Sequence, residues 1–147
     1  MVLLLTFGQL SGQDFSPYNT GSNMSVFVTN DAEITFDIEH EIQTIGVFYT
    51  DSLGDLQCAG SSDFVSGETF QVVVWGSESE EADNGMANDE VLTWLAVTDE
   101  GFMYNVSATY ESYEPVDMST YALNKISFVT GLDFQLDQSS VVEGCMD

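Results

Sequence analysis

The sequence predicts an all-β protein, a single antiparallel β-sandwich of the jelly-roll or immunoglobulin-like kind, with little or no helix. Hydrophobic and polar residues alternate with a period of two along most of the chain, which is the pattern of half-buried strands. Turn-forming sequences rich in Gly, Asn and Asp separate these runs at short, regular intervals, as in sandwiches. Of the 147 residues, 44% are hydrophobic and 12% aromatic, which is enough for one sizeable core.

The strands are predicted from runs of alternating, β-branched and aromatic residues. The clearest run is "EITFDIE", residues 33–39, in which alternate residues are apolar. In chain order the runs are "MSVFVT" (24–29), "EITFDIE" (33–39), "IGVFYT" (45–50), "FQVVVWG" (70–76), "VLTWLAVT" (91–98), "FMYNVSATYESY" (102–113) and "KISFVTGLDFQLDQ" (125–138). The turns between them are "TGSN" at 20, "DSLGD" at 51, "VSGE" at 65, "DNG" at 83 and "TDEG" at 98.

The two ends of the chain are expected to lie outside the domain. Residues 1–13, "MVLLLTFGQLSGQ", contain a short apolar run followed by small residues, as at the end of a secretory leader, although the usual positive segment is missing. The alternative is that this apolar run is retained as a strand. The folded domain is predicted to span residues 14–140, and residues 141–147 form a tail.

The charge balance restricts the classes of partner. The chain has 25 acidic residues against a single basic one, Lys125, and a net charge of −24. Nucleic acids and anionic membrane surfaces need several Lys or Arg, so both are excluded as partners. Cations and neutral ligands such as sugars remain, together with the simpler explanation that the charge only keeps the protein soluble in a saline medium.

The acidic stretch "SESEEADNGMANDE", residues 77–90, is the strongest candidate for a cation site. Calcium takes about six to eight oxygen ligands from carboxylates, amides and backbone carbonyls. The candidate ligands are Asp83, Asn84, Asp89 and Glu90, with Glu80 and Glu81 in addition. The EF-hand spacing fails, because placing Gly85 at the required glycine puts Ala82 and Val91 at ligand positions. A solvated loop is the alternative, and a catalytic carboxylate pair is a third interpretation.

Aromatic side chains are a second candidate for binding. Tyr110 and Tyr113 lie in the polar sequence "YESYEP", so we expect them to be exposed and able to stack on sugar rings. Core packing is the alternative for the aromatic residues in general. The only histidine, His40, has no Ser and Asp pattern around it that indicates a catalytic triad, so no enzyme activity is expected.

The order of the motifs resembles a β-rich module of secreted and surface proteins of marine Bacteroidota. The matching segments are "TGSNMSVFV", "IGVFYTDSLGDLQCAG", "GETFQVVVWG", "NGMANDEVLTW" and "YALNKISFVTGL". Asn84 and Met86 replace the aspartate and phenylalanine of the family's D-G-F motif. The resemblance implies an extracellular or cell-surface location rather than an activity.

The resemblance also bears on three single residues. "EGCMD" at the end of the chain is similar to the start of a cysteine-containing repeat that often follows such modules. Cys145 would then belong to that repeat, whereas a disulfide between Cys58 and Cys145 is the alternative. "DSL" at 51 is similar to an O-glycosylation signal of the same bacteria, with Ser52 as the acceptor.

Together these observations predict a secreted or cell-surface module that binds, adheres or spaces rather than catalyses, with a weak calcium site. Its expected partners are an extracellular glycan or protein. The alternative is a structural subunit of an extracellular filament or surface layer that self-assembles by strand pairing, with residues 2–7 as a donated strand. A hydrolase acting on a neutral polysaccharide is the least favoured interpretation.

Overall fold

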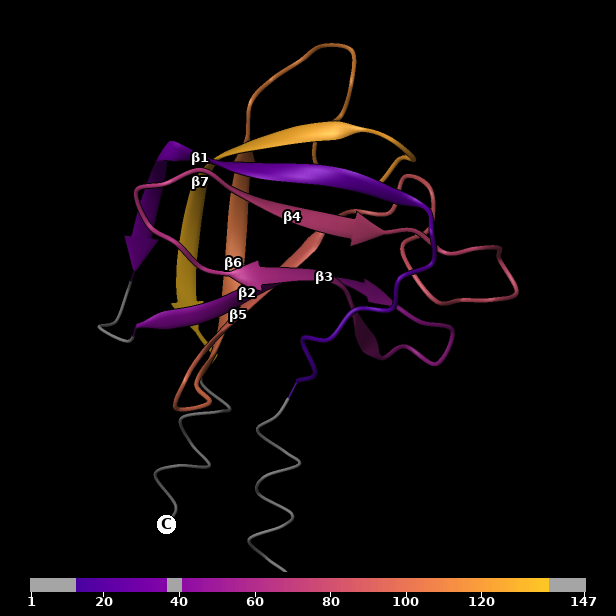
Figure 1. The fold of residues 1–147 in the computed structure, drawn as a ribbon, viewed down its shortest axis with the longest axis horizontal. Coiled ribbons are helices and arrows are strands. Elements are labelled where there is room, and N and C mark those ends of the chain that lie inside the picture. The colour runs from indigo at the N-terminus through magenta and orange to yellow at the C-terminus, as the bar shows by residue number, and fades with distance from the viewer. Residues whose placement is uncertain (1–12, 37–40, 138–147) are drawn as a thin grey trace, which may run out of the picture.

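The structure is a computed structural model that describes residues 13–36 and 41–137. These residues form seven strands and no helix, so the prediction of an all-β protein is confirmed (Figure 1). The strands are β1 (Asn23–Phe36), β2 (Ile42–Thr50), β3 (Leu56–Asp63), β4 (Phe70–Trp75), β5 (Thr93–Thr98), β6 (Met103–Tyr110) and β7 (Ile126–Leu136).

The strands form one mixed sheet in the order β3-β2-β5-β6-β7-β1-β4. The prediction of a purely antiparallel arrangement is wrong for one pair, because β1 and β7 run parallel with Phe27 opposite Phe128 and Phe36 opposite Phe134. Parallel neighbours need a long crossover, which the five strands between β1 and β7 provide. All other neighbouring strands are antiparallel.

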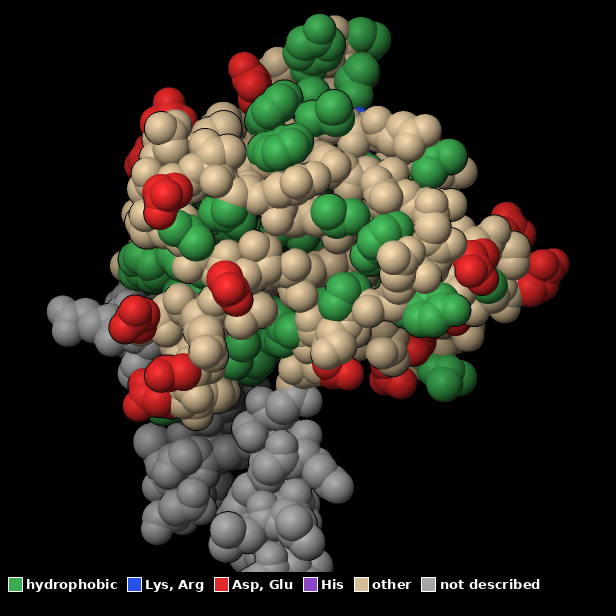
Figure 2. Space-filling view, viewed as in Figure 1, with side chains coloured by type: hydrophobic (Ala, Val, Ile, Leu, Met, Phe, Trp, Pro, Cys, Tyr) green, Lys and Arg blue, Asp and Glu red, His purple; other side chains and the backbone are tan. Residues whose placement is uncertain are grey.

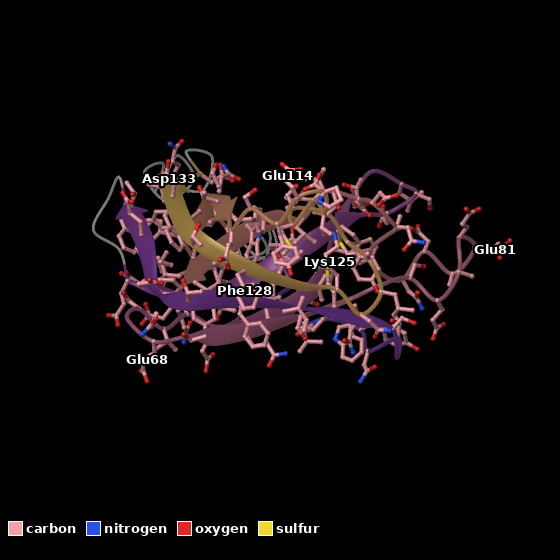
Figure 3. All side chains as sticks on the ribbon, turned by 90° about the horizontal axis from the view of Figure 1, so that it is seen from above. Glu68, Glu81, Glu114, Lys125, Phe128 and Asp133 are labelled. Carbon is pink, nitrogen blue, oxygen red and sulfur yellow. The ribbon has the colours of Figure 1, made fainter. Side chains whose placement is uncertain are left out.

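The sheet curls until its two edge strands, β3 and β4, lie against each other. Gly60 of β3 makes this approach possible, because a side chain there would overlap the carbonyl oxygen of Val73 in β4. The result is nearly a barrel, and the hydrogen bonds join all seven strands in one sheet rather than in the two sheets of the predicted sandwich. Figures 1 and 3 show the strands wrapped around a common interior.

The interior is filled by one face of each strand, as the alternation predicts. Along β1, Met24, Val26 and Val28 are buried, and the residues between them face outward. The largest fully buried side chains of this interior include Tyr104, Phe134 and Met24. Alternation therefore determines which side chains enter the core.

Strand β3 is the element that the sequence pattern failed to predict. Its sequence "LQCAGSSD" has no β-branched or aromatic residue. Its small residues Ala59 and Gly60 are buried where the edge strands touch. The predicted run at 24–29 and the first four residues of the run at 33–39 belong to the single long strand β1, and residues 37–40 lie outside the described part of the chain. The expectation that alternation buries Phe36 is wrong, because this side chain is 43% exposed and only stacks beside Phe134.

The segment before β1 belongs to the folded domain. Phe15 packs edge-on against Phe48, with ring centroids 5.0 Å apart, over a small apolar cluster on the outer side of β2, β3 and β5. Ser61 Oγ donates to the Phe15 carbonyl over 2.7 Å, and Gln13 Nε2 donates to the Leu56 carbonyl over 3.0 Å. Apart from Gln13, the predicted leader lies outside the described residues, as does the predicted tail.

We expect Gly60→Ala to lower the free energy of unfolding by about 2 kcal/mol, because the added methyl group would push apart the β3 and β4 backbones. Gly131→Ala is the matched control, since its added atom would meet Thr109 Cβ at an ordinary 3.4 Å. Urea unfolding followed by tryptophan fluorescence measures both changes. Equal stability of the two variants would contradict the closure of the sheet at Gly60.

Candidate ligand site at the acidic loop

The acidic loop, residues 77–90, connects β4 to β5 and is anchored to the core at its middle. The buried Met86 side chain lies in the main hydrophobic cluster. The Met86 amide donates to the Trp75 carbonyl over 3.0 Å, and the Ser77 amide donates to the Met86 carbonyl over 2.9 Å. A side chain at Gly85 would overlap the Gly76 backbone, so glycine is needed where the middle of the loop folds back on its start.

Asn84 organises the first half of the loop. Its side-chain Oδ1 accepts hydrogen bonds from the Glu78 amide over 3.0 Å and from Ser77 Oγ over 3.3 Å. Its Nδ2 donates to the Glu78 carboxylate over 3.2 Å. Asn84 is thus already bonded within the loop, which explains its presence without a cation.

Asp83 and Glu90 tie the acidic loop to the end of β2 and the turn that follows it. Asp83 Oδ2 accepts from the Ser52 amide over 2.7 Å. Glu90 accepts from the Thr50 amide through one carboxylate oxygen and from the Ala87 amide through the other, each over 3.0 Å. Hydrogen bonds to an ionised acceptor are stronger than those between neutral groups, so two carboxylates hold the loop in place.

Negative charge gathers around Tyr49 at this junction. Burial raises the pKa of Tyr49, and the nearby carboxylates of Asp83, Asp51 and Glu90 raise it further. The backbone amide of Asp55 and the side chain of Gln57 stabilise the ionised Asp51 and lower its pKa from 3.8. Sequence reasoning did not include Asp51 or Tyr49 in this site, although the "DSLGD" turn contained the signal for Asp51.

A cavity of about 550 Å³ lies between the acidic loop, the end of β2 and the segment before β7. Tyr121 and Leu123 are among its walls. Tyr121 is buried, which raises the pKa of its hydroxyl, and this hydroxyl lies against the backbone of Gly76, where no side chain would fit. The polar lining consists of Ser22, Thr50, Ser77, Glu78, Ser79, Glu80, Asp83, Asn88 and Glu90.

The predicted calcium ligands do not form one coordination shell in the structure. Asp83, Asn84 and Glu90 already accept the bonds described above, and Asp89 is exposed with a positive φ of 64°. Glu81 lies at the tip of the loop and points away from the body of the molecule (Figure 3). Within residues 13–36 and 41–137, no three His, Cys, Asp or Glu side chains are placed to hold a metal ion together. Calcium binding therefore stays a prediction.

The two tyrosines predicted to be exposed, Tyr110 and Tyr113, differ in their exposure to solvent. Tyr113 is 67% exposed, as predicted. Tyr110 is half-buried, and its hydroxyl accepts a hydrogen bond from Trp94 Nε1 over 2.7 Å. Burial raises the pKa of Tyr110 to about 12. The prediction that Tyr110 is exposed is wrong because the buried indole of Trp94 needs this acceptor.

Two further predicted residues have distinct environments. Ser52 is exposed in the turn between β2 and β3, and its glycosylation stays a prediction. Cys58 is buried and forms no disulfide within the described residues; its Sγ donates to the Gly60 carbonyl over 3.5 Å, and burial raises its pKa to about 11. Cys145 lies outside the described residues, so the pairing of the two cysteines is open.

We expect Glu90→Gln to destabilise the protein by about 1 kcal/mol, because an amide loses the charge and one of the two acceptor oxygens that bind Thr50 and Ala87. Hydrogen exchange at the Thr50 and Ala87 amides should become faster. Glu81→Gln makes the same chemical change at the loop tip and is the control. Unchanged exchange at both amides would refute the tethering role of Glu90.

We expect Asp51 to make stability depend on pH in the acid range. Its pKa lies below the ordinary 3.8 in the folded state, so its contribution is full above the unfolded value and disappears as pH falls through the folded value. Asp51→Asn should reduce the loss of stability between pH 5 and pH 2, as measured by urea unfolding. Identical pH profiles for the two proteins would contradict this role.

Comparison of the chain with protein-family models, curated proteins and solved structures returned no match. The resemblance to Bacteroidota surface modules therefore stays a prediction. In the part of the chain that the structure describes, no helix is long and apolar enough to cross a membrane.

Proposed function

We propose that this protein is a non-catalytic binding or adhesion module, secreted or held at the cell surface, whose ligand enters the cavity at the acidic loop. The observation that carries the proposal is the cavity of about 550 Å³ lined by hydroxyl, amide and carboxylate groups. Its walls come from separate parts of the chain and are anchored through Met86, Asp83 and Glu90. Because the walls of this pocket are already fixed, little conformational entropy is lost when a ligand binds.

The charge of the cavity indicates which ligands it accepts. Carboxylates and side-chain hydroxyls at its walls can accept hydrogen bonds from ligand hydroxyl or ammonium groups. The single basic residue, Lys125, is already occupied, because its Nζ donates to the carbonyls of Asp117 and Thr120, each over 2.6 Å. An anionic ligand would meet repulsion without a compensating cation. A neutral, hydroxyl-rich glycan is the ligand that fits best.

Calcium has a supporting role in this proposal. Glu78 and Glu80 line the cavity and are exposed, so a calcium ion could join them to ligand hydroxyls, with the open positions filled by water. Such a site would be of the weak, extracellular kind.

The filament alternative has less support in the described residues. Assembly by strand pairing needs an open sheet edge, and the β3 and β4 edges lie against each other at Gly60 and Val73. The predicted donor strand, residues 2–7, lies outside the described residues. A module in which both edges are partly covered is better suited to binding a ligand than to extending a sheet.

We expect Leu123→Trp to weaken glycan binding at least tenfold, because Leu123 lines the cavity and is exposed at its wall. Leu53→Trp is the control, since Leu53 is exposed on the neighbouring turn and is not part of the cavity lining. A glycan array followed by calorimetry with the best neutral oligosaccharide gives the affinities. Absence of binding to any neutral glycan, with or without calcium, would overturn the glycan proposal.

We expect millimolar calcium to raise the melting temperature by a few degrees relative to EDTA, because an ion that binds only the folded state stabilises it. The double variant Glu78→Gln, Glu80→Gln should lose this shift, whereas Glu68→Gln, on the turn before β4, should keep it. A melting temperature that is the same in calcium and in EDTA would refute the role of calcium and leave the cavity proposal standing.

A further inference from the structure

We propose that the outer face of β7, β1 and β4 is a second binding surface, which takes a neutral polysaccharide chain by stacking on aromatic rings. We call it the aromatic face, and it is centred on Phe128, Phe27 and Trp75. This inference rests on the proposed binding function but uses a surface separate from the acidic-loop cavity.

The register of the strands brings the rings to this face. Phe27 and Phe128 are direct partners in the parallel pair β1–β7, and both alternate with buried neighbours, so they point outward. Their rings are stacked, with centroids 5.8 Å apart and planes inclined by 24°. Both rings are only partly buried, so the pair offers a shared apolar surface to solvent.

Trp75 extends the face along the strands. It is partly buried, alternates with the buried Val74 in β4, and is the partner of Asn23 in β1. Phe27 lies four residues further along β1, so the rings span roughly 13 Å along the strand direction. Val73 and Ile126 lie opposite Ser25 on either side of β1 and add apolar surface between the rings.

Polar groups lie beside the rings. Gln71 is the partner of Phe27 in β4, and its Nε2 donates to Ser25 Oγ over 2.9 Å. Gln71 is exposed, so its amide oxygen can accept from a ligand hydroxyl. Figure 2, which views this side of the molecule, shows hydrophobic side chains gathered over β7 and β1, with most of the acidic side chains nearer the outline.

The distribution of charge indicates which kind of ligand the aromatic face binds. Further along β1 and β7 the outer surface carries Glu33 and Asp133. The outward positions around the three rings, however, carry no charge, although the chain has 25 acidic residues. These positions are Asn23, Ser25, Phe27, Thr29, Gln71, Val73, Trp75, Ile126, Phe128 and Thr130. A cationic protein would be drawn to the acidic ends rather than to this face, and a second copy would be repelled by a net charge of −24 on each chain. A neutral polysaccharide meets neither obstacle, and the C–H groups of its sugar rings can pack on aromatic faces.

The test is electrophoresis of the protein through native gels that contain hydroxyethyl cellulose, a neutral polysaccharide, or alginate, an anionic one. We expect hydroxyethyl cellulose to retard the protein and alginate to leave it unaffected. Phe27→Ala and Phe128→Ala should each remove at least three quarters of the retardation. Phe36→Ala is the matched control, because Phe36 is also in β1 and stacks on a β7 phenylalanine, Phe134, at 4.9 Å, away from the aromatic face.

Tryptophan fluorescence gives a second readout. Trp75 is partly exposed at the aromatic face and Trp94 is 3% exposed in the core, so a neutral oligosaccharide should change the emission of Trp75. Circular dichroism and melting confirm that each variant is folded.

The outcomes separate the two proposals. Retardation that Leu123→Trp removes and Phe27→Ala does not would overturn the aromatic face and support the cavity. Retardation that neither variant changes would also overturn the aromatic face. If the unaltered protein shows neither retardation nor a fluorescence change, the aromatic-face proposal is also overturned. Binding of a short glycan on the array in that case would still support the cavity as a binding site. A concentration-dependent dimer that Phe27→Ala dissolves would identify the face as a contact between copies and overturn the glycan assignment.

Discussion

The contact between Gly60 and the Val73 carbonyl is the constraint on which the rest of the structure depends. It brings the two edge strands together and turns a seven-stranded sheet into a nearly closed body. Closure partly covers the two edges, which would otherwise present unpaired backbone groups. It also gives the sheet one enclosed interior and one continuous outer surface. The acidic loop and the aromatic face are both carried by β4, one of the strands that meet at this contact.

A chain with one lysine and no arginine cannot rely on ion pairs to fix its loops. Its carboxylates bind backbone amides instead: Asp83 binds Ser52, Glu90 binds Thr50, and Asp51 binds Leu53 and Asp55. Lys125 likewise bonds to backbone carbonyls. Such bonds need no cationic side chain as a partner, so a chain with one lysine can still fix its loops with carboxylates. For the same reason Asp83 and Glu90, which the sequence predicts as calcium ligands, form hydrogen bonds within the protein itself.

The two proposed surfaces differ in polarity and charge. The cavity at the acidic loop is polar and negatively charged, which suits hydroxyl groups or a cation. The aromatic face is uncharged and suits the apolar side of a sugar ring. A polysaccharide chain on the face and a single sugar unit in the cavity would contribute jointly to affinity if one chain reached both surfaces. Both surfaces are consistent with an extracellular module that holds neutral glycans.

The sequence by itself determined that the protein is all-β, together with most strand positions and many of the buried side chains, because alternation in a strand is a local property. It predicted Tyr113 as exposed, and it placed the acidic loop between two core strands. Only the tertiary structure decided that the strands form one nearly closed mixed sheet rather than the predicted sandwich. The tertiary structure likewise decided the parallel pairing of β1 with β7, since that depends on strands far apart in sequence. It also decided that Tyr110 faces Trp94, that Asp83 and Glu90 bind backbone amides of β2 and its turn, and that Phe27, Phe128 and Trp75 share one face. These contacts join segments that are far apart in the sequence. Alternation within one strand carries no information about its neighbours, so only the assembled sheet could determine these contacts.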